Sequence, residues 1–254
     1  MAPLAPSVVP SRFVHQDRHG LVPSVDRPAG RPPPVEPDTL VTTMTTDLEL
    51  RVAWHRHLGR GRPAEVWFDT VTARYRSADR RYHDVRHLRW VLRHTASLLR
   101  RHAVDDPDAV VAAAFFHDAV HTVDRSDDEA MSAELARCAL TELGWSEPRR
   151  EHVATMVLAT THRPGSADVD DLGTAVLLAA DLAVLAAEPG AYGDYTRSVR
   201  HEYAELDDDQ WCAGRREVID GFLGRPTIFP VRLGLDDWER RARANLAAEA
   251  AALR

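Results

Sequence analysis

Apolar side chains recur along most of the chain with the spacing of α-helices. From about residue 47 onward, nearly every segment places them three or four positions apart, a period that lines one face of a helix. The clearest stripe is Leu88, Val91, Leu92, Thr95, Leu98 and Leu99, and further helices are predicted over 147–160, 173–186, 192–205, 208–223 and 236–253. No alternating β-branched run bounded by turn residues interrupts this pattern. The sequence therefore predicts an all-α fold.

The beginning of the chain differs from the rest. Residues 1–45 are rich in proline, lack helical periodicity and include Pro32-Pro33-Pro34. A segment of this composition cannot bury a core, so we expect a disordered Pro-rich tail over 1–45 and a single helical domain over 46–254. Met44 opens a stretch that itself resembles a protein start, which suggests the hypothesis that residues 1–43 are not translated natively.

Charge and cysteine content narrow the classes of function. A net charge of −7 provides no broad basic field, which argues against a nucleic-acid polymer as partner. Cys138 and Cys212 form no CxxC motif and resemble small apolar residues of a reducing compartment. No apolar run reaches the roughly 18 residues of a membrane span, and the N-terminus lacks the layout of a secretory signal. We therefore expect a cytoplasmic protein without a membrane partner.

Two histidine pairs are candidates for chemistry. His83 and His87 are four positions apart, and His117 and His121 repeat that spacing. On a helix, such residues differ by about 40° of rotation and roughly 6 Å of rise, so both rings can face one point. Either pair could also arise by chance in a chain with 13 histidines. The pairs alone therefore do not distinguish a metal site from ordinary surface histidines.

Two carboxylates in apolar surroundings add to this picture. Asp118 follows His117 and the apolar run over 112–116, and Asp181 is the only charged residue between Asp171 and Glu188. A carboxylate is costly to bury unless it is paired or binds a cation. Asp118 could instead lie at a helix end beside an arginine. A cation held jointly with histidines accounts for both carboxylates.

These residues, in this order, resemble the HD superfamily of metal-dependent phosphohydrolases. "RRYHDVRHL" is similar to the Arg-x-Tyr-His-x-x-x-His opening of a bacterial subgroup, "FFHDAVH" to its His-Asp segment and "AADLAVL" to its late Asp. The resemblance covers residues 47–254 and implies an HD-type helical domain. It also implies metal ligands at His87, His117, Asp118 and Asp181.

The resemblance implies further roles as well. His83 stands where cyclic-nucleotide phosphodiesterase relatives have their general acid. Asp127-Asp128-Glu129 stands where the subgroup more often has Asp-Asn-Glu, which leaves the roles of these acids open, with Glu129 as the catalytic candidate. His162 is a candidate ligand of a second metal or of phosphate. Ala179 replaces an aspartate of the relatives, which argues against a full second metal site.

Three more residues near these motifs remain candidates. Arg81 and Arg86 lie close in sequence to the histidines and could bind a substrate phosphate, although helix arginines are usually just solvated. His121 has no role in the resemblance and stays unassigned. The expected donors, two imidazoles and two carboxylates, suit a divalent Mn, Mg, Fe, Ni, Co or Zn ion without selecting among them.

The expected function is a metal-dependent phosphohydrolase, either a phosphomonoesterase or a phosphodiesterase. Its expected partner is a small phosphorylated metabolite such as a nucleotide, whose phosphorus a water activated by the ion would attack. One alternative is an HD-type di-iron oxygenase, which needs extra ligands such as His121 or His162. Another is a metal- or nucleotide-binding regulatory module without turnover. The sequence leaves a homodimer open.

Overall fold

The computed structural model describes residues 37–122, 127–162 and 169–253, with side chains from Thr45 onward. These ranges form ten α-helices and two short 3-10 helices, with no strand among them. In chain order they are α1 (Pro37–His57), α2 (Arg62–Tyr75), α3 (Val85–Leu99), α4 (Pro107–Phe116), α5 (Asp128–Glu142), α6 (Glu147–Ala159), α7 (Leu172–Asp181), η2 (Leu182–Ala186), α8 (Pro189–Glu202), α9 (Asp208–Leu223), η3 (Val231–Leu233) and α10 (Asp236–Ala252). The predicted all-α fold is confirmed.

The first helix begins earlier than predicted. The sequence pattern places its start near residue 47, whereas α1 begins at Pro37, inside the expected tail over 1–45. Proline is favoured in the first turn of a helix, and no proline or glycine follows it before Gly59. The remainder of the expected tail, residues 1–36, lies outside the described residues.

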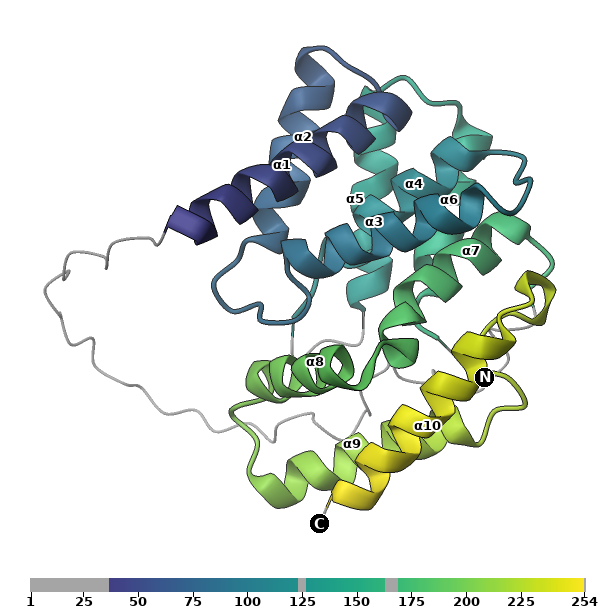
Figure 1. Ribbon diagram of the computed structural model, residues 1–254. Coiled ribbons are helices and arrows are strands. Elements are labelled where there is room, and N and C mark those ends of the chain that lie inside the picture. The colour runs from purple at the N-terminus through teal and green to yellow at the C-terminus, as the bar shows by residue number, and fades with distance from the viewer. Residues whose placement is uncertain (1–36, 123–126, 163–168, 254) are drawn as a thin grey trace, which may run out of the picture.

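Helix α4 forms the centre of the core. Every residue from 109 to 116 is buried, because α4 packs against α1, α3, α5, α6 and α7 (Figure 1). A helix surrounded in this way is apolar on all sides. Near its C-terminal end, the Phe115 ring meets the Trp54 indole of α1 edge to face, with centroids 5.0 Å apart. The end of α4 is therefore held within the core.

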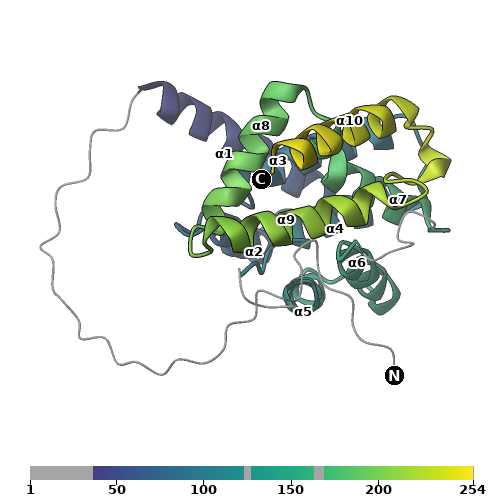
Figure 2. The same ribbon diagram turned by 90° about the horizontal axis from the view of Figure 1, so that it is seen from below.

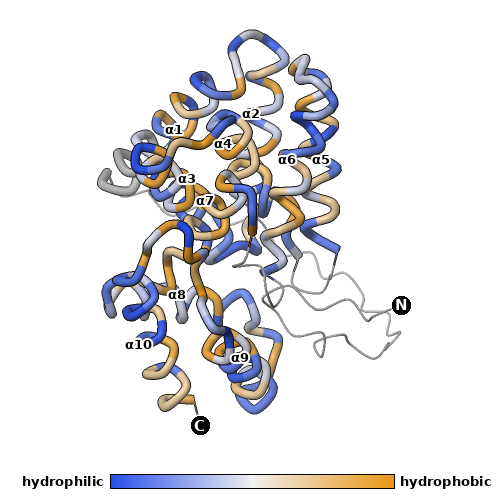
Figure 3. The backbone as a smooth tube through the Cα atoms, turned by 90° about the vertical axis from the view of Figure 1, so that its right-hand side faces the viewer, coloured by the Kyte–Doolittle hydropathy of each residue, from blue (hydrophilic) through white to orange (hydrophobic). Residues whose placement is uncertain are grey.

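Helices α8, α9 and α10 lie together at the end of the molecule away from α1, α2, α5 and α6 (Figure 3), and α9 runs beside α10 (Figure 2). A buried ion pair ties them together, since Arg215 of α9 binds both carboxylate oxygens of Glu249 of α10 at 2.7 and 3.0 Å. Arg215 also donates to the Tyr195 hydroxyl of α8 at 3.2 Å. The Tyr195 ring in turn packs on Tyr82, with centroids 4.7 Å apart. This network attaches α8 to the segment between α2 and α3.

Helix α7 is almost entirely apolar and is buried from Gly173 to Ala180. It packs on α3 and α4, which brings its C-terminal end toward the ends of those helices. Among the described residues, no single helix is long and apolar enough to cross a membrane. Only the pair Leu172–Ala186 and Pro189–Glu202 meets that criterion, and the pair is bent by 101°.

Candidate metal centre

The His-Asp pair lies just beyond the end of α4. The helix ends at Phe116, His117 occupies the capping position, and Asp118 lies in the following turn. His121 belongs to the extended segment after that turn, so the prediction that His117 and His121 share a helix face is wrong. The end of a helix leaves backbone carbonyls without partners inside the helix, and here other side chains bind them.

Tyr75 and Arg80 hold this turn. The Tyr75 hydroxyl donates to the Phe115 carbonyl at 3.1 Å and accepts from the Asp118 backbone N–H at 3.2 Å. The guanidinium of Arg80 donates to the carbonyl oxygens of Asp118 at 2.7 Å and Ala119 at 3.2 Å. Arg80 is only 7% exposed, and it did not stand out in the sequence because its neighbours are also charged. These contacts fix the direction in which the His-Asp pair points.

His87 lies in the first turn of α3. Asp84 caps this helix, and its side chain accepts from the Arg86 backbone N–H at 2.8 Å. The apolar stripe that begins at Leu88 packs into the core, which buries His87 beside it. His83 precedes the helix, so the helical spacing expected for His83 and His87 does not apply. The turn nevertheless brings their rings to a centroid separation of 5.7 Å.

Asp181 is the last residue of α7, at the point where the helix tightens into η2. The predicted helix over 173–186 corresponds to α7 and η2 together, and Asp181 lies at their junction. Its side chain is 14% exposed, because the end of α7 opens onto the same space as the turn after α4. The apolar run buries the helix and leaves the carboxylate at its end.

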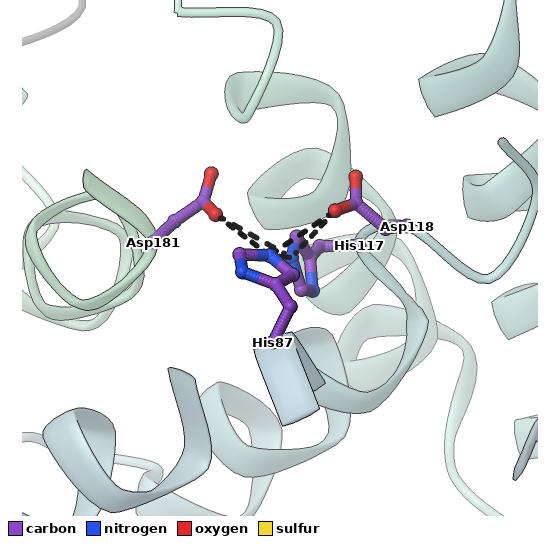
Figure 4. A group of neighbouring side chains, drawn as sticks. All are labelled: His87, His117, Asp118 and Asp181. Atoms are coloured by element: carbon purple, nitrogen blue, oxygen red, sulfur yellow. Dashed lines mark hydrogen bonds and ion pairs between the residues drawn. The ribbon is translucent and has the colours of Figure 1, made fainter. Parts of the chain in front are cut away.

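The donor atoms of four residues converge (Figure 4). The Nε2 atoms of His87 and His117 are 3.1 Å apart. Asp118 Oδ2 lies 3.3 and 3.1 Å from these nitrogens, and Asp181 Oδ1 lies 3.4 and 3.5 Å from them. Metal–ligand bonds of about 2.1 Å at tetrahedral or octahedral angles separate ligand atoms by about 3.0–3.4 Å. His87, His117, Asp118 and Asp181 could thus hold one divalent ion.

The charges in this group suit a cation. Burial alone would raise the pKa of Asp118, but His117 and His87 beside it hold that pKa well below its usual range. Burial also opposes ionisation of Asp181, and His117 again outweighs it, so the pKa of Asp181 lies well below its usual range. Both carboxylates stay ionised at neutral pH. Together with two imidazoles, they form a donor set for transition metals and Mg²⁺ alike.

The orientation of His117 is set by its second nitrogen. Its Nδ1–H donates to the Ala114 carbonyl at 2.9 Å, which assigns the proton to Nδ1 and leaves the Nε2 lone pair for an ion. Nδ1 of His87 is buried without a hydrogen-bond partner in the described part of the chain. The Tyr82 ring lies against His87 instead, with centroids 4.8 Å apart. Hydrogen bonding thus orients one imidazole, and packing orients the other.

His162 contacts this group without joining it. It is 3% exposed and adopts a left-handed backbone conformation with φ of 48°. Its Nε2 lies 2.7 Å from Oδ2 of Asp181, the oxygen that does not face the other imidazoles. The His162 carbonyl accepts from the Arg225 guanidinium. In this arrangement His162 orients the Asp181 carboxylate, and its role as a ligand of a second metal or of phosphate stays a prediction.

Glu129 lies in the first turn of α5, partly buried. Burial, together with the charges of Asp118, Asp128 and Asp181, raises the pKa of Glu129 to about 7. Its neighbour Asp128 has a different environment, because its carboxylate accepts from the Thr122 backbone N–H at 2.6 Å and from the Thr122 hydroxyl. Asp128 therefore anchors the segment that follows the His-Asp pair, whereas Glu129 is a carboxyl group that can gain or lose a proton near neutrality.

The two predicted phosphate ligands are on the surface. The Arg86 side chain is 74% exposed, and its guanidinium binds the Asp84 carboxylate at 2.8 Å and the Arg81 carbonyl at 2.9 Å. Arg81 is exposed, and its backbone N–H donates to Glu202. The buried arginine of this segment is Arg80, which binds backbone carbonyls.

A second group of possible ligands combines His83, His121 and Glu202. Oε1 of Glu202 accepts the backbone N–H groups of Arg81, Tyr82 and His83 at 2.7, 2.7 and 3.0 Å, and Oε2 lies 2.7 Å from Nδ1 of His83. Burial, followed by the charge of His83, lowers the pKa of His121 to about 3. Sequence reasoning missed Glu202 because it lies in a charged stretch of α8 and is buried only by contact with a segment about 120 positions earlier.

No protein-family model, curated protein or solved structure matches the chain. An all-helical fold that brings histidines and aspartates into metal-binding proximity is compatible with an HD-type domain.

Proposed function

We propose that the chain is an HD-type metal-dependent phosphohydrolase that acts on a small phosphorylated metabolite, with nucleotides as the leading class. The observation that carries this proposal is the convergence of His87, His117, Asp118 and Asp181, with donor atoms 3.1–3.5 Å apart across the His–His and His–Asp pairs. Three separate segments contribute them, in the order that the resemblance implies. A divalent ion bound there would supply Lewis acidity toward a phosphoryl oxygen and toward water.

Two side chains of the protein itself are the candidates for moving protons. Glu129, with a pKa of about 7, can accept a proton from the attacking water. His83 is the candidate donor to the leaving oxygen. Its Nδ1 is engaged by Glu202 at 2.7 Å, so Nε2 is the nitrogen that can reach a substrate. Glu202 is thus a positioning residue in this mechanism.

Exposed arginines can supply the remaining contacts to the substrate. Arg81 and Arg86 both lie at the surface of the segment that carries His83 and His87. The Arg86 guanidinium already binds Asp84, so Arg81 is the better candidate for a phosphate contact. Arginine suits this task because it binds phosphate oxygens in a bidentate manner.

The proposal is tested by metal analysis followed by a substrate panel. The protein is stripped with a chelator, reloaded with Mn²⁺, Mg²⁺, Fe²⁺, Ni²⁺, Co²⁺ or Zn²⁺, and assayed on nucleotides, sugar phosphates and phosphodiesters. We expect hydrolysis by the wild type and loss of both metal and activity in Asp118→Ala. Asp69→Ala, a change at an exposed aspartate, is the matched control and should retain both.

Three outcomes would contradict the proposal. Absence of hydrolysis with every ion, combined with nucleotide binding that leaves the nucleotide intact, would favour a regulatory module. Two bound irons and substrate-dependent oxygen consumption would favour the di-iron oxygenase. Hydrolysis that survives Asp118→Ala would show that the activity does not use this centre.

A further inference from the structure

The cluster of His83, His121 and Glu202 shares no residue with the four-residue centre. One donor atom from each of its residues lies within 4.8 Å of the other two. Oε2 of Glu202 is 2.7 Å from Nδ1 of His83 and 3.8 Å from Nε2 of His121. The two imidazole rings lie against each other, with centroids 3.9 Å apart and planes tilted by 34°. The cluster thus brings two nitrogens to one carboxylate oxygen.

Glu202 is held in a fixed direction by the backbone. Its Oε1 accepts three successive N–H groups, from Arg81, Tyr82 and His83. The side chain is 1% exposed, and Glu202 is the last residue of α8. Because one oxygen is fully occupied, the other is directed at the two imidazoles. Hydrogen bonding of this kind is what orients a carboxylate ligand in metal sites.

One ring nitrogen of His121 lacks a hydrogen-bond partner among the described residues. Nε2 of His121 is buried and makes no hydrogen bond in the described part of the chain. A buried polar atom without a partner costs about 1–3 kcal/mol, so such an atom calls for an explanation. The 3.8 Å to Glu202 Oε2 is too long for a hydrogen bond. It exceeds the roughly 3.4 Å between two ligand atoms of one ion by a few tenths of an ångström, so the His121 ring would move slightly toward Glu202 on binding.

We propose that His83, His121 and Glu202 form a second cation site, selective for an imidazole-preferring divalent ion such as Zn²⁺, Co²⁺ or Ni²⁺. Two histidines and one glutamate form a donor set that zinc uses where a further coordination position stays open. Binding would replace the proton shared by His83 Nδ1 and Glu202 Oε2, and this proton passes to solvent.

The charge around the cluster decides the class of ion. The cluster contains one carboxylate, and the guanidinium of Arg80 lies close by, bonded to the His83 carbonyl at 3.1 Å. A site with little net negative charge and a single carboxylate suits Mg²⁺ and Ca²⁺ poorly, since these ions take oxygen ligands. Imidazole nitrogens instead favour the later transition metals. The four-residue centre, with two carboxylates, has no such restriction.

The full-length chain is first freed of metal and then equilibrated with Zn²⁺ by dialysis. Elemental analysis counts the Zn²⁺ ions bound per chain. His121→Phe keeps a ring against His83 and removes both ring nitrogens, and Asp118→Asn weakens the other centre. We expect about two ions in the wild type, about one in each single variant and about none in the double variant. Circular dichroism and urea unfolding check that each variant is folded.

One ion in the wild type would overturn the proposal, and so would two ions in a folded His121→Phe. Two ions in the double variant would place the bound zinc elsewhere and would also overturn it. Because the measurement is metal binding, it is independent of hydrolysis. If the protein hydrolyses no phosphate ester, the expected zinc counts stay the same. If the zinc counts contradict the second site, the proposed phosphohydrolase activity at the four-residue centre is unaffected.

Discussion

Replacement of Tyr75 by phenylalanine tests whether one hydroxyl holds the helix end that carries the metal ligands. Tyr75 is fully buried, and its hydroxyl bridges the Phe115 carbonyl and the Asp118 N–H at 3.1 and 3.2 Å. Burial raises the pKa of Tyr75 to about 12, so the hydroxyl keeps its proton and can donate. Phenylalanine preserves the ring packing and leaves two buried backbone groups without this partner. At about 1–3 kcal/mol for each, the free energy of unfolding should fall by about 2–6 kcal/mol.

The same substitution should also weaken metal binding at the candidate centre, because Tyr75 fixes the backbone of the candidate ligand Asp118. Loss of a contact that orients a ligand typically lowers affinity by about 10–100-fold. Urea unfolding of the chelated protein measures the first effect, and Mn²⁺ titration measures the second.

Tyr192→Phe is the matched control for both measurements. It removes a hydroxyl that binds Glu249 and none of the four centre residues, so it should lower stability without changing Mn²⁺ affinity. If Tyr75→Phe unfolds within about 0.5 kcal/mol of the wild type and binds Mn²⁺ equally well, the hydroxyl does not hold the turn.

Two further predictions concern buried charge. The first concerns Glu129 in protein freed of metal by a chelator. Between about pH 4.5 and 7, the folded state keeps the Glu129 proton because the pKa is raised, whereas the unfolded state has lost it. The free energy of unfolding therefore falls as the pH rises through that window. Glu129→Gln should remove this loss. Its free energy of unfolding should exceed that of the wild type by about 1–3 kcal/mol at pH 7 but not at pH 4. A difference that does not change with pH would refute this prediction. Arg215→Met should cost about 3–5 kcal/mol because it leaves the Glu249 carboxylate buried without its cation. Most of that cost should be recovered in the double variant with Glu249→Leu, and equal stability of the single and double variants in urea unfolding would contradict this.

Helix content could be predicted from the sequence, and its motifs implied the four residues of the candidate centre. The apolar period determines which faces are buried, and it gave helix bounds over 208–223 that coincide with α9. The His-Asp pair and the lone Asp181 stood out because ionisable groups in apolar stretches are costly unless they are paired. Spacing within a helix was a poorer guide, since His83 precedes α3 and His121 follows the turn after α4.

Only the tertiary structure brought in the residues that position the ligands. Glu202, Arg80 and Tyr75 lie in polar or amphipathic stretches whose local pattern predicts solvent-facing or packing roles. They act by binding backbone groups of segments far away in the chain, as Glu202 does with residues 81–83 and Arg80 with the turn after α4. The sequence by itself determined that the chain is helical and singled out the His-Asp pair and Asp181, because burial of apolar faces and the cost of isolated charge are local properties. The full set of four, with His87, was implied by the resemblance to the HD superfamily. Packing between helices decided which polar groups fix those side chains, and it brought His83 and His121 together at Glu202. The sequence could not predict this, because hydrogen bonds between distant segments produce no periodic pattern of residues.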